Sequence, residues 1–293
     1  MLGALIGDMV GSKFEFTEFK GKKFAFFDEH CHPTDDSFMT LAIAKALVVC
    51  KDWTDEENLK VTTIRSMKEV AERHKDTGWG GSFYKWLFLP GYCKPYNSFG
   101  NGAGMRISPV GWVANSEEEV KYLSRVLTEI SHNHPEGLKG AEAIAMAVYL
   151  ARTGNSREEI RERMIKDYYP EIARMTVENI RPNYGIDDDG NWVTCQGSVP
   201  HSLVSFFDST DFEDAVRNGI SLGGDADTIG CMAGAVAEAY YGISYEDEDK
   251  ALEFLSDDLK SIYFAFDAIK KKRSKKEGLF KKLTENRQLL KLI

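Results

Sequence analysis

Gly223-Gly224-Asp225-Ala226-Asp227-Thr228-Ile229-Gly230 places two carboxylates and a hydroxyl directly before an apolar run. The two leading glycines can adopt positive φ and turn the chain sharply. The run from Ile229 to Tyr240 is apolar at helical spacing, which predicts a helix with these oxygens at its N-terminus. Asp and Thr are also favoured there as plain helix caps, so this stretch alone leaves capping and metal binding both open.

A second stretch of the same kind, Pro33-Thr34-Asp35-Asp36-Ser37, precedes an apolar helical pattern from Phe38 to Val48. Pro and Thr in this position are typical of a helix start. Because the following helix is strongly apolar, we expect it to be deeply packed, with its acids at the wall of a cleft. Bringing Asp35 and Asp36 near Asp225 and Asp227 would crowd four like charges, which raises their pKa values or recruits cations. Carboxylate and hydroxyl oxygens suit Mg²⁺, Mn²⁺ or Ca²⁺ and disfavour zinc.

The composition is typical of a soluble globular protein with one or two domains. The 293 residues are 43% hydrophobic and 28% charged, with a net charge of -9. This acidic balance disfavours general nucleic-acid binding, which depends on Lys and Arg that neutralise phosphates. No apolar run approaches the roughly 20 residues of a membrane-spanning helix, and the segment Met1 to Val10 lacks the basic start of a signal peptide. We therefore expect a cytoplasmic protein that does not bind membranes.

The rest of the chain is predicted to consist mainly of helices joined by glycine-rich loops. The segment 2–12 is a small-residue apolar helix with Gly3, Gly7 and Gly11 spaced four residues apart, which permits close helix packing. Loops 77–82 and 99–106 could cradle phosphate, although plain connectors are more common and neither loop fits a P-loop or a Rossmann fingerprint. Further helices are expected at these residues: 61–74, 117–130, 137–151, 202–207 and 250–268.

Four polar features are ambiguous from their residue types alone. Glu15 in a loop is interpreted as a solvated acid. The two histidines of the segment 131–135 favour a hydrogen-bonding role, because no thiol or third imidazole accompanies them. The acidic run 187–190 resembles a calcium loop but has Ser198 where the bidentate Glu belongs, so a solvated turn is expected. The basic run 270–276 is interpreted as a solvated face.

In several motifs the chain resembles the ADP-ribosylglycohydrolase family, which includes the dinitrogenase-reductase-activating glycohydrolase and the ADP-ribosylarginine and ADP-ribosylserine hydrolases. The matching motifs are Gly7-Asp8-x-x-Gly11 with Glu15, Thr34-Asp35-Asp36-Ser37, Gly100-Asn101-Gly102, His134-Pro135, Ser198-Val199-Pro200 and Gly223-Gly224-Asp225-Ala226-Asp227-Thr228. The paired acidic motifs in this order are specific, whereas the glycine loops alone are not. The resemblance implies an all-α, single-domain fold with a cleft that holds two divalent cations, Mg²⁺ or in some members Mn²⁺.

The resemblance also implies roles for individual residues. Glu15 matches an acidic gate residue on a mobile loop, which reverses its interpretation as a solvated acid. Ser37 stands where many members have Thr and keeps the hydroxyl. The implied catalytic residues are Glu15, Asp35 and Asp225. The implied metal ligands are Thr34, Asp35, Asp36, Asp225, Asp227 and Thr228. The implied substrate-binding residues are Gly80, Gly81, Gly102, His134, Gln196 and Ser198.

The function that the resemblance implies is metal-dependent removal of ADP-ribose from a modified protein side chain, with arginine as the first choice. Water would attack C1″ of the distal ribose, with Asp35 or Glu15 as general base. The alternatives are another ADP-ribosyl bond, in a serine, poly-ADP-ribose, O-acyl or nucleotide linkage, and a non-catalytic ADP-ribose-binding or structural relative. We expect a monomer that acts on an ADP-ribosylated protein or small conjugate. Residues 1–268 would form the domain and 269–293 a helical, Lys-rich extension packed on or beside it.

Overall fold

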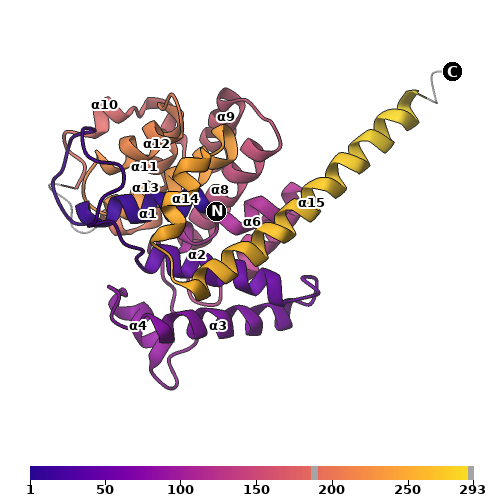
Figure 1. Ribbon diagram of the computed structural model, residues 1–293, viewed down its shortest axis with the longest axis horizontal. Coiled ribbons are helices and arrows are strands. Elements are labelled where there is room, and N and C mark those ends of the chain that lie inside the picture. The colour runs from indigo at the N-terminus through magenta and orange to yellow at the C-terminus, as the bar shows by residue number, and fades with distance from the viewer. Residues whose placement is uncertain (186–190, 290–293) are drawn as a thin grey trace.

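The computed structural model describes residues 1–185 and 191–289, and every regular element in those ranges is a helix. The only strand-like pairings there are two isolated bridges, Thr17 with Gly224 and Gly100 with Thr194. The prediction of an all-α, single-domain fold is therefore confirmed (Figure 1). The acidic run 187–190, interpreted above as a solvated turn, lies outside the described residues.

The longest connections between helices within the described ranges are the loops 15–34 and 89–101. The α-helices are α1 (Leu2–Gly11), α2 (Asp35–Val49), α3 (Glu56–Arg73), α4 (Gly81–Phe88), α5 (Gly102–Met105), α6 (Ser108–Val113), α7 (Glu117–Thr128), α8 (Pro135–Arg152), α9 (Arg157–Asp167), α10 (Val177–Ile180), α11 (Cys195–Phe207), α12 (Phe212–Ile220), α13 (Ala226–Tyr241), α14 (Tyr245–Glu253) and α15 (Asp257–Leu289).

The glycine spacing at the N-terminus brings α1 into backbone contact with α13. A Cβ atom on Gly7 would lie 2.0 Å from the carbonyl oxygen of Gly230, and one on Gly234 would lie 2.2 Å from that of Gly3. No side chain larger than hydrogen fits at these contacts, because real Cβ atoms do not approach backbone oxygens so closely. The pair α1 and α13 therefore forms a tightly packed centre of the molecule (Figure 1).

The second central helix, α2, is buried along most of its length, as its apolar sequence predicts. Thr34 is its N-cap, and the Thr34 hydroxyl accepts a hydrogen bond from the backbone N–H of Asp36 at 3.4 Å. The helix packs between α1, α3 and the first part of α15. Thr34, Asp36 and Ser37 are thereby held in the interior of the protein, while Asp35 is partly exposed.

The prediction of a single helix over 250–268 is wrong, because α14 ends at Glu253 and α15 begins at Asp257. Leu255 in the break is buried and anchors the turn in the core. Ser256 followed by two aspartates is itself a helix-start signal: an oxygen of Asp258 accepts a hydrogen bond from the Ser256 hydroxyl, and the acids favour a helix N-terminus. Two other helices begin earlier than expected, α3 at Glu56 and α11 at Cys195.

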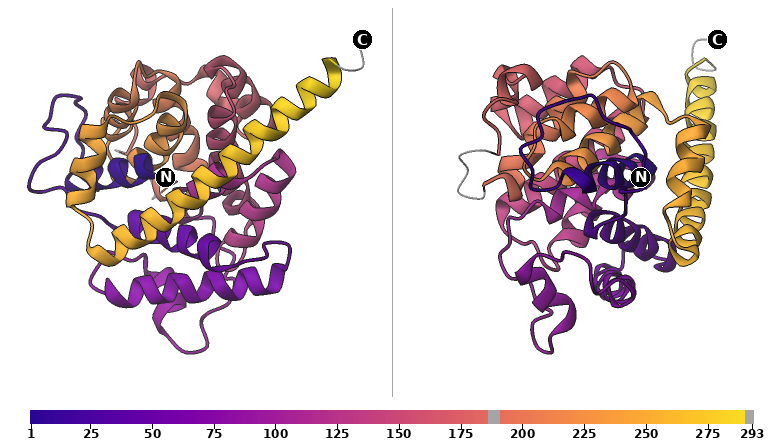
Figure 2. Two further views of the ribbon diagram at one scale, coloured as in Figure 1. Left: turned by 45° about the vertical axis from the view of Figure 1, so that its right-hand side comes forward. Right: turned by 60° about the vertical axis from the view of Figure 1, so that its left-hand side comes forward.

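The long helix α15 packs along α2 and α6 and then extends past the body of the molecule (Figure 2). Arg273 contacts Glu119 at 2.7 Å and stacks over the ring of Trp53, and Lys270 lies 3.6 Å from Glu238. The expected boundary between residues 268 and 269 falls within this continuous helix. None of the helices in the described ranges combines the length and apolar character that crossing a membrane requires.

Candidate metal centre and active site

The N-terminal ends of α2 and α13 meet the C-terminal half of α1, and each of the three helices contributes acids to one buried site. Asp225 is the residue before α13, yet its side chain makes no capping hydrogen bond to that helix. Its carboxylate instead accepts a hydrogen bond from the Asn101 amide at 2.6 Å. Thr228, one turn into α13, donates to Asp36 at 3.2 Å. Of the two roles left open for this stretch, side-chain capping of α13 by Asp225 is therefore not observed.

Asp8 is the site residue that the sequence analysis missed as a candidate ligand. Its carboxylate accepts hydrogen bonds from the Thr34 N–H at 2.9 Å, the Thr34 hydroxyl at 2.5 Å and the Ser37 N–H at 3.1 Å. Asp8 therefore ties α1 to the first turn of α2. The signal was present, since Asp8 is the one charged residue in the apolar segment 2–11 and lies between two packing glycines.

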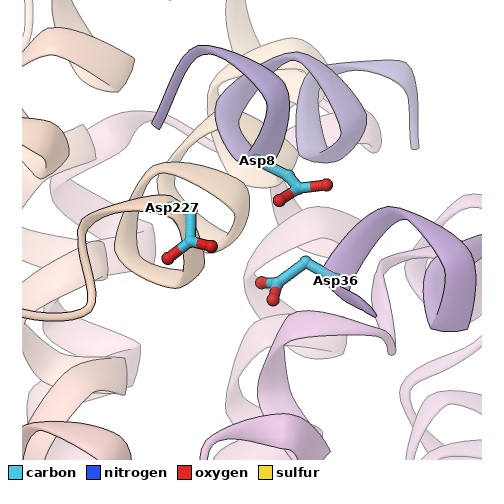
Figure 3. A group of neighbouring side chains, drawn as sticks. All are labelled: Asp8, Asp36 and Asp227. Carbon is cyan, nitrogen blue, oxygen red and sulfur yellow. The ribbon is translucent and has the colours of Figure 1, made fainter. Parts of the chain in front are cut away.

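Two groups of three carboxylates share Asp227. Asp8, Asp36 and Asp227 form one group, whose carboxylates face a common space from three helices (Figure 3). Glu15, Asp225 and Asp227 form the other, and within each group oxygen atoms lie within 4.8 Å of one another. The structure thus brings the acids of α2 and α13 together, although they are about 190 positions apart in the sequence. Asp35 lines the same cavity.

Burial of so many carboxylates strongly disfavours their charged forms. Burial first, and the neighbouring acids second, raise the pKa values of Asp35, Asp36 and Asp227 well above the usual range. Burial also raises the pKa of Asp225, against the hydrogen bond from Asn101. The pKa of Glu15, which is half-buried, rises to about 7 because of burial and then the charges of Asp225 and Asp8.

The donor set fits a hard divalent cation. Asp36 Oδ1 is buried and has no hydrogen-bond partner in the described part of the chain, although buried polar atoms are nearly always paired. A cation would satisfy this oxygen and neutralise the crowded acids at once. The two groups of three consist of carboxylates and include no cysteine or histidine, which suits Mg²⁺ or Mn²⁺ better than zinc.

The loop that carries Glu15 is attached to the turn that carries Asp225. The Phe16 N–H donates to the Gly224 carbonyl at 2.7 Å, and the Gly224 N–H donates to the Thr17 carbonyl at 3.1 Å. Gly223 and Gly224 both have positive φ, of 74° and 65°, as the sequence predicts for a sharp turn. These contacts hold Glu15 over the carboxylates.

A cavity of about 470 Å³ opens beside the acids. Three of the six expected substrate-binding residues, Gly80, Gly81 and Gly102, line it together with Glu15 and Asp35. Further lining residues that the sequence analysis did not select are Phe16, Tyr96, Phe99, Asn101, Arg106 and His132.

The other three expected residues, His134, Gln196 and Ser198, are not among the lining residues. His134 is the N-cap of α8, where its Nδ1 accepts a hydrogen bond from the Glu136 N–H at 3.1 Å. The Ser198 hydroxyl donates to the Thr194 carbonyl at 2.7 Å within α11. Gln196 lies in the first turn of the same helix. The placements of His134 and Ser198 follow from the helix starts at Pro135 and Cys195, because each side chain is hydrogen-bonded at the start of its own helix.

Thr34, an expected metal ligand, also lies outside the cavity lining and donates its hydroxyl proton to Asp8. Its hydroxyl oxygen also accepts from the backbone N–H of Asp36, so the Thr34 hydroxyl links α1 to the first turn of α2. The remaining five expected ligands all contribute to the lining: Asp35, Asp36, Asp225, Asp227 and Thr228.

We expect the metal-free protein to lose stability as the pH rises from 5.5 to 8. Carboxyl groups with raised folded-state pKa values bind more protons in the folded than in the unfolded state, so their contribution falls as pH passes through those values. Thermal unfolding of EDTA-treated protein at both pH values, with and without Mg²⁺, measures this. Added Mg²⁺ should remove most of the difference, and an unchanged pH dependence would contradict the metal assignment.

An all-α domain with buried groups of carboxylates beside a cavity has the features of a hydrolase with an acidic active site, and comparison with known proteins gives the family. The family model described as ADP-ribosylglycohydrolase matches residues 1–255. Because that match covers most of the 293 residues, the chain belongs to the ADP-ribosylglycohydrolase family, as its motifs predicted. The family consists of hydrolases that act on ADP-ribosyl glycosidic bonds.

Individual relatives cover most of the chain at low identity. ADP-ribosylhydrolase ARH3 from Homo sapiens is 25% identical over 308 residues, covering 83% of this chain and 84% of that protein. ADP-ribosylarginine hydrolase Tri1 from Pseudomonas putida is 24% identical over 274 residues, covering 83% and 70%. A solved ADP-ribosylglycohydrolase-related protein complex has a TM-score of 0.60 and 23% identity, covers 92% of this chain and 97% of that one, and supports the fold.

Proposed function

We propose that this chain is a metal-dependent hydrolase that removes ADP-ribose from modified arginine side chains. The proposal rests mainly on one observation: two groups of three carboxylates share Asp227 and lie beside one cavity. Like charges at this spacing and burial are expected where cations bind. The cavity volume lies within the range of about 300–1,000 Å³ that is usual for small-molecule sites.

The residues proposed to hold two divalent cations are Asp8, Asp36 and Asp227 on one side, and Glu15, Asp225 and Asp227 on the other. When bound, such cations lower the pKa of water and orient sugar hydroxyls. Thr228 and Asn101 hold two of these carboxylates in place through hydrogen bonds to Asp36 and Asp225. The proposed metal is Mg²⁺, with Mn²⁺ as the alternative.

Glu15 and Asp35 are the carboxylates proposed to accept a proton from the attacking water. Both line the cavity and neither is completely enclosed, which leaves them accessible to water. A general base must reach the water that it deprotonates, and both side chains lie at the cavity wall beside the proposed cation sites. The leaving side chain would depart from an oxocarbenium-like ribose.

Arginine is the first choice of linkage for two reasons. The relative from Pseudomonas putida is an ADP-ribosylarginine hydrolase. The cavity is also lined by five acids, Glu15, Asp35, Asp36, Asp225 and Asp227, against the single cation Arg106 among its described lining. With two divalent cations bound, their positive charges and that of Arg106 balance the five acids, so a cationic guanidinium leaving group meets no net repulsion.

A linkage panel tests the proposal. Peptides that carry ADP-ribose on arginine or serine, O-acetyl-ADP-ribose and poly-ADP-ribose are incubated with the protein and Mg²⁺, and free ADP-ribose is quantified. We expect the arginine-linked peptide to have the largest kcat/KM, by about tenfold or more, because a site matched to one leaving group discriminates by at least about 1.4 kcal/mol. Faster release from serine would reassign the linkage, and release from none would favour the non-catalytic alternative.

A further inference from the structure

Arg106 is a buried cation without a carboxylate partner in the described part of the chain. It directly follows α5, is fully buried, and stacks over the ring of Phe83 at 5.5 Å. Its Nε and Nη1 atoms have no hydrogen-bond partner among the described residues. Burial lowers the pKa of Arg106 to about 10, so the guanidinium remains charged at neutral pH. A buried charge without a carboxylate partner lowers the stability of the fold, so we expect Arg106 to have a functional role.

The third guanidinium nitrogen begins a short hydrogen-bonded chain. Arg106 Nη2 donates to the Ser131 hydroxyl oxygen at 2.8 Å, and that hydroxyl lies 2.9 Å from Nδ1 of His132. Nη2 itself lies 3.4 Å from the same Nδ1. A guanidinium carries donors only, and the Ser131 oxygen already accepts from it, so the serine proton is free to point to Nδ1. Both neighbours of Nδ1 therefore present protons to it.

His132 accordingly carries no proton on Nδ1. The ring is buried between Phe83 and Tyr96, whose centroids lie 6.1 Å and 5.8 Å away. Burial first, and the charge of Arg106 second, keep the pKa of His132 well below its usual value, so the ring is neutral at pH 7. A neutral imidazole has one proton, and with Nδ1 as acceptor that proton is on Nε2.

Nε2 faces the glycine loop at the edge of the cavity. A Cβ atom added to Gly102 would lie 3.3 Å from Nε2, and one added to Gly100 would lie 3.7 Å from it. His132 lines the cavity, and no hydrogen bond to Nε2 is found within residues 1–185 and 191–289. The ring thus has one fixed acceptor side, inside the protein, and one free donor side, toward the cavity.

We propose that Arg106 and Ser131 are positioning residues that fix His132 as its Nε2–H tautomer, so that His132 donates a hydrogen bond to an oxygen of the bound ligand. Donation from Arg106 through Ser131 polarises the ring and strengthens Nε2–H as a donor, since hydrogen bonds in a chain reinforce one another. The acceptor is a phosphate or hydroxyl oxygen. Only the identity of that ligand, ADP-ribose, rests on the proposed function.

Nitrogen NMR of the ligand-free protein tests the tautomer without reference to activity. Histidine is labelled with ¹⁵N, and His132→Asn assigns the His132 signals. At pH 6 to 8 we expect a protonated, pyrrole-like Nε2 and an unprotonated, pyridine-like Nδ1. In Arg106→Met the two nitrogen shifts should move toward each other, as the tautomers mix, while Arg106→Lys should retain most of the preference. A protonated Nδ1, or a cationic ring at pH 7, in the wild type would overturn the proposal.

Calorimetric titration of ADP-ribose, in the presence of Mg²⁺, tests the consequence for binding. We expect about tenfold weaker binding for Arg106→Met and about threefold for Ser131→Ala, as for loss or weakening of one charge-assisted hydrogen bond. In a His132→Ala protein, adding Arg106→Met or Ser131→Ala should not weaken ADP-ribose binding any further. Ser205→Ala removes a buried hydroxyl whose one hydrogen bond among the described residues is to the His201 carbonyl. It is the matched control and should bind as the wild type does.

These outcomes distinguish the positioning role of Arg106 and Ser131 from the proposed function. Equal losses for Arg106→Met with and without His132 would overturn the positioning role and indicate a merely structural one. Ser131→Ala gives the same comparison if Arg106→Met does not fold. A wild-type protein that binds no ADP-ribose would contradict the proposed function, while the NMR result would continue to decide the tautomer.

Discussion

Asp227→Asn should lower kcat for ADP-ribose release by about a thousandfold or more, while the metal-free protein becomes more stable at pH 8. Asp227 belongs to both carboxylate groups, so its loss affects both proposed cation sites. Metal-assisted chemistry contributes several kcal/mol to the transition state, and about 4 kcal/mol corresponds to a thousandfold in rate. The amide keeps the shape of the side chain but removes one buried charge.

The opposite signs of these two effects exclude unfolding as the cause of inactivity. Neighbouring acids and burial raise the pKa of Asp227 well above its usual value, so at pH 8 the ionised form destabilises the metal-free fold. Activity is measured as free ADP-ribose released, and stability by thermal unfolding after EDTA treatment. Asp76→Asn, at an exposed position, is the control and should change neither quantity. An active Asp227→Asn protein would contradict the metal site.

Gly7→Ala should destabilise the fold by about 3 kcal/mol, at the upper end of what overpacking costs in a core. Helix propensity alone would predict the opposite sign, since alanine is about 1 kcal/mol better than glycine inside a helix. The contact dominates here, because the new methyl group would lie 2.0 Å from the Gly230 oxygen and 2.3 Å from its carbonyl carbon. Helix α1 must then move away from α13 and carry the adjacent Asp8 with it.

Urea unfolding of the Mg²⁺-loaded protein measures this change in the free energy of unfolding. Gly78→Ala is the matched control, because an added Cβ meets nothing within 4 Å there, and its effect should stay within about 0.5 kcal/mol. Gly7→Ala should also weaken Mg²⁺ binding, since Asp8 fixes the first turn of α2. A neutral or stabilising Gly7→Ala would show that the two backbones are not in contact.

The sequence predicts the central packing and the acidic pairs because these depend on local patterns. Glycines at four-residue spacing indicate a close helix contact, and acids directly before an apolar helix indicate a buried helix start. Local sequence does not show which residues each of these acids meets in the folded protein. Nothing in the segment 2–11 shows that its only charge, Asp8, meets Thr34 and Asp36, since that depends on the packing of α1 on the start of α2.

The residues that line the cavity are harder to predict. A shift of one residue in the start of a helix changes which of its side chains faces the cavity. His132 and His134 lie in one loop, but the start of α8 at Pro135 makes His134 its cap and leaves His132 for the cavity. The expected helix start at 202 left Ser198 in a loop, whereas α11 begins at Cys195 and encloses it. Arg106 shows no sign in the sequence of being buried without an acid.

The central claim is that the shared carboxylates hold divalent cations, and the direct measurement is the number of Mn²⁺ ions bound by EDTA-treated protein at pH 7.5. Calorimetric titration of the wild type and Asp227→Asn, side by side, provides it. The two carboxylate groups predict two ions per chain in the wild type, and much weaker binding in the variant. No bound ion in the wild type, or equal binding in both proteins, would contradict the account.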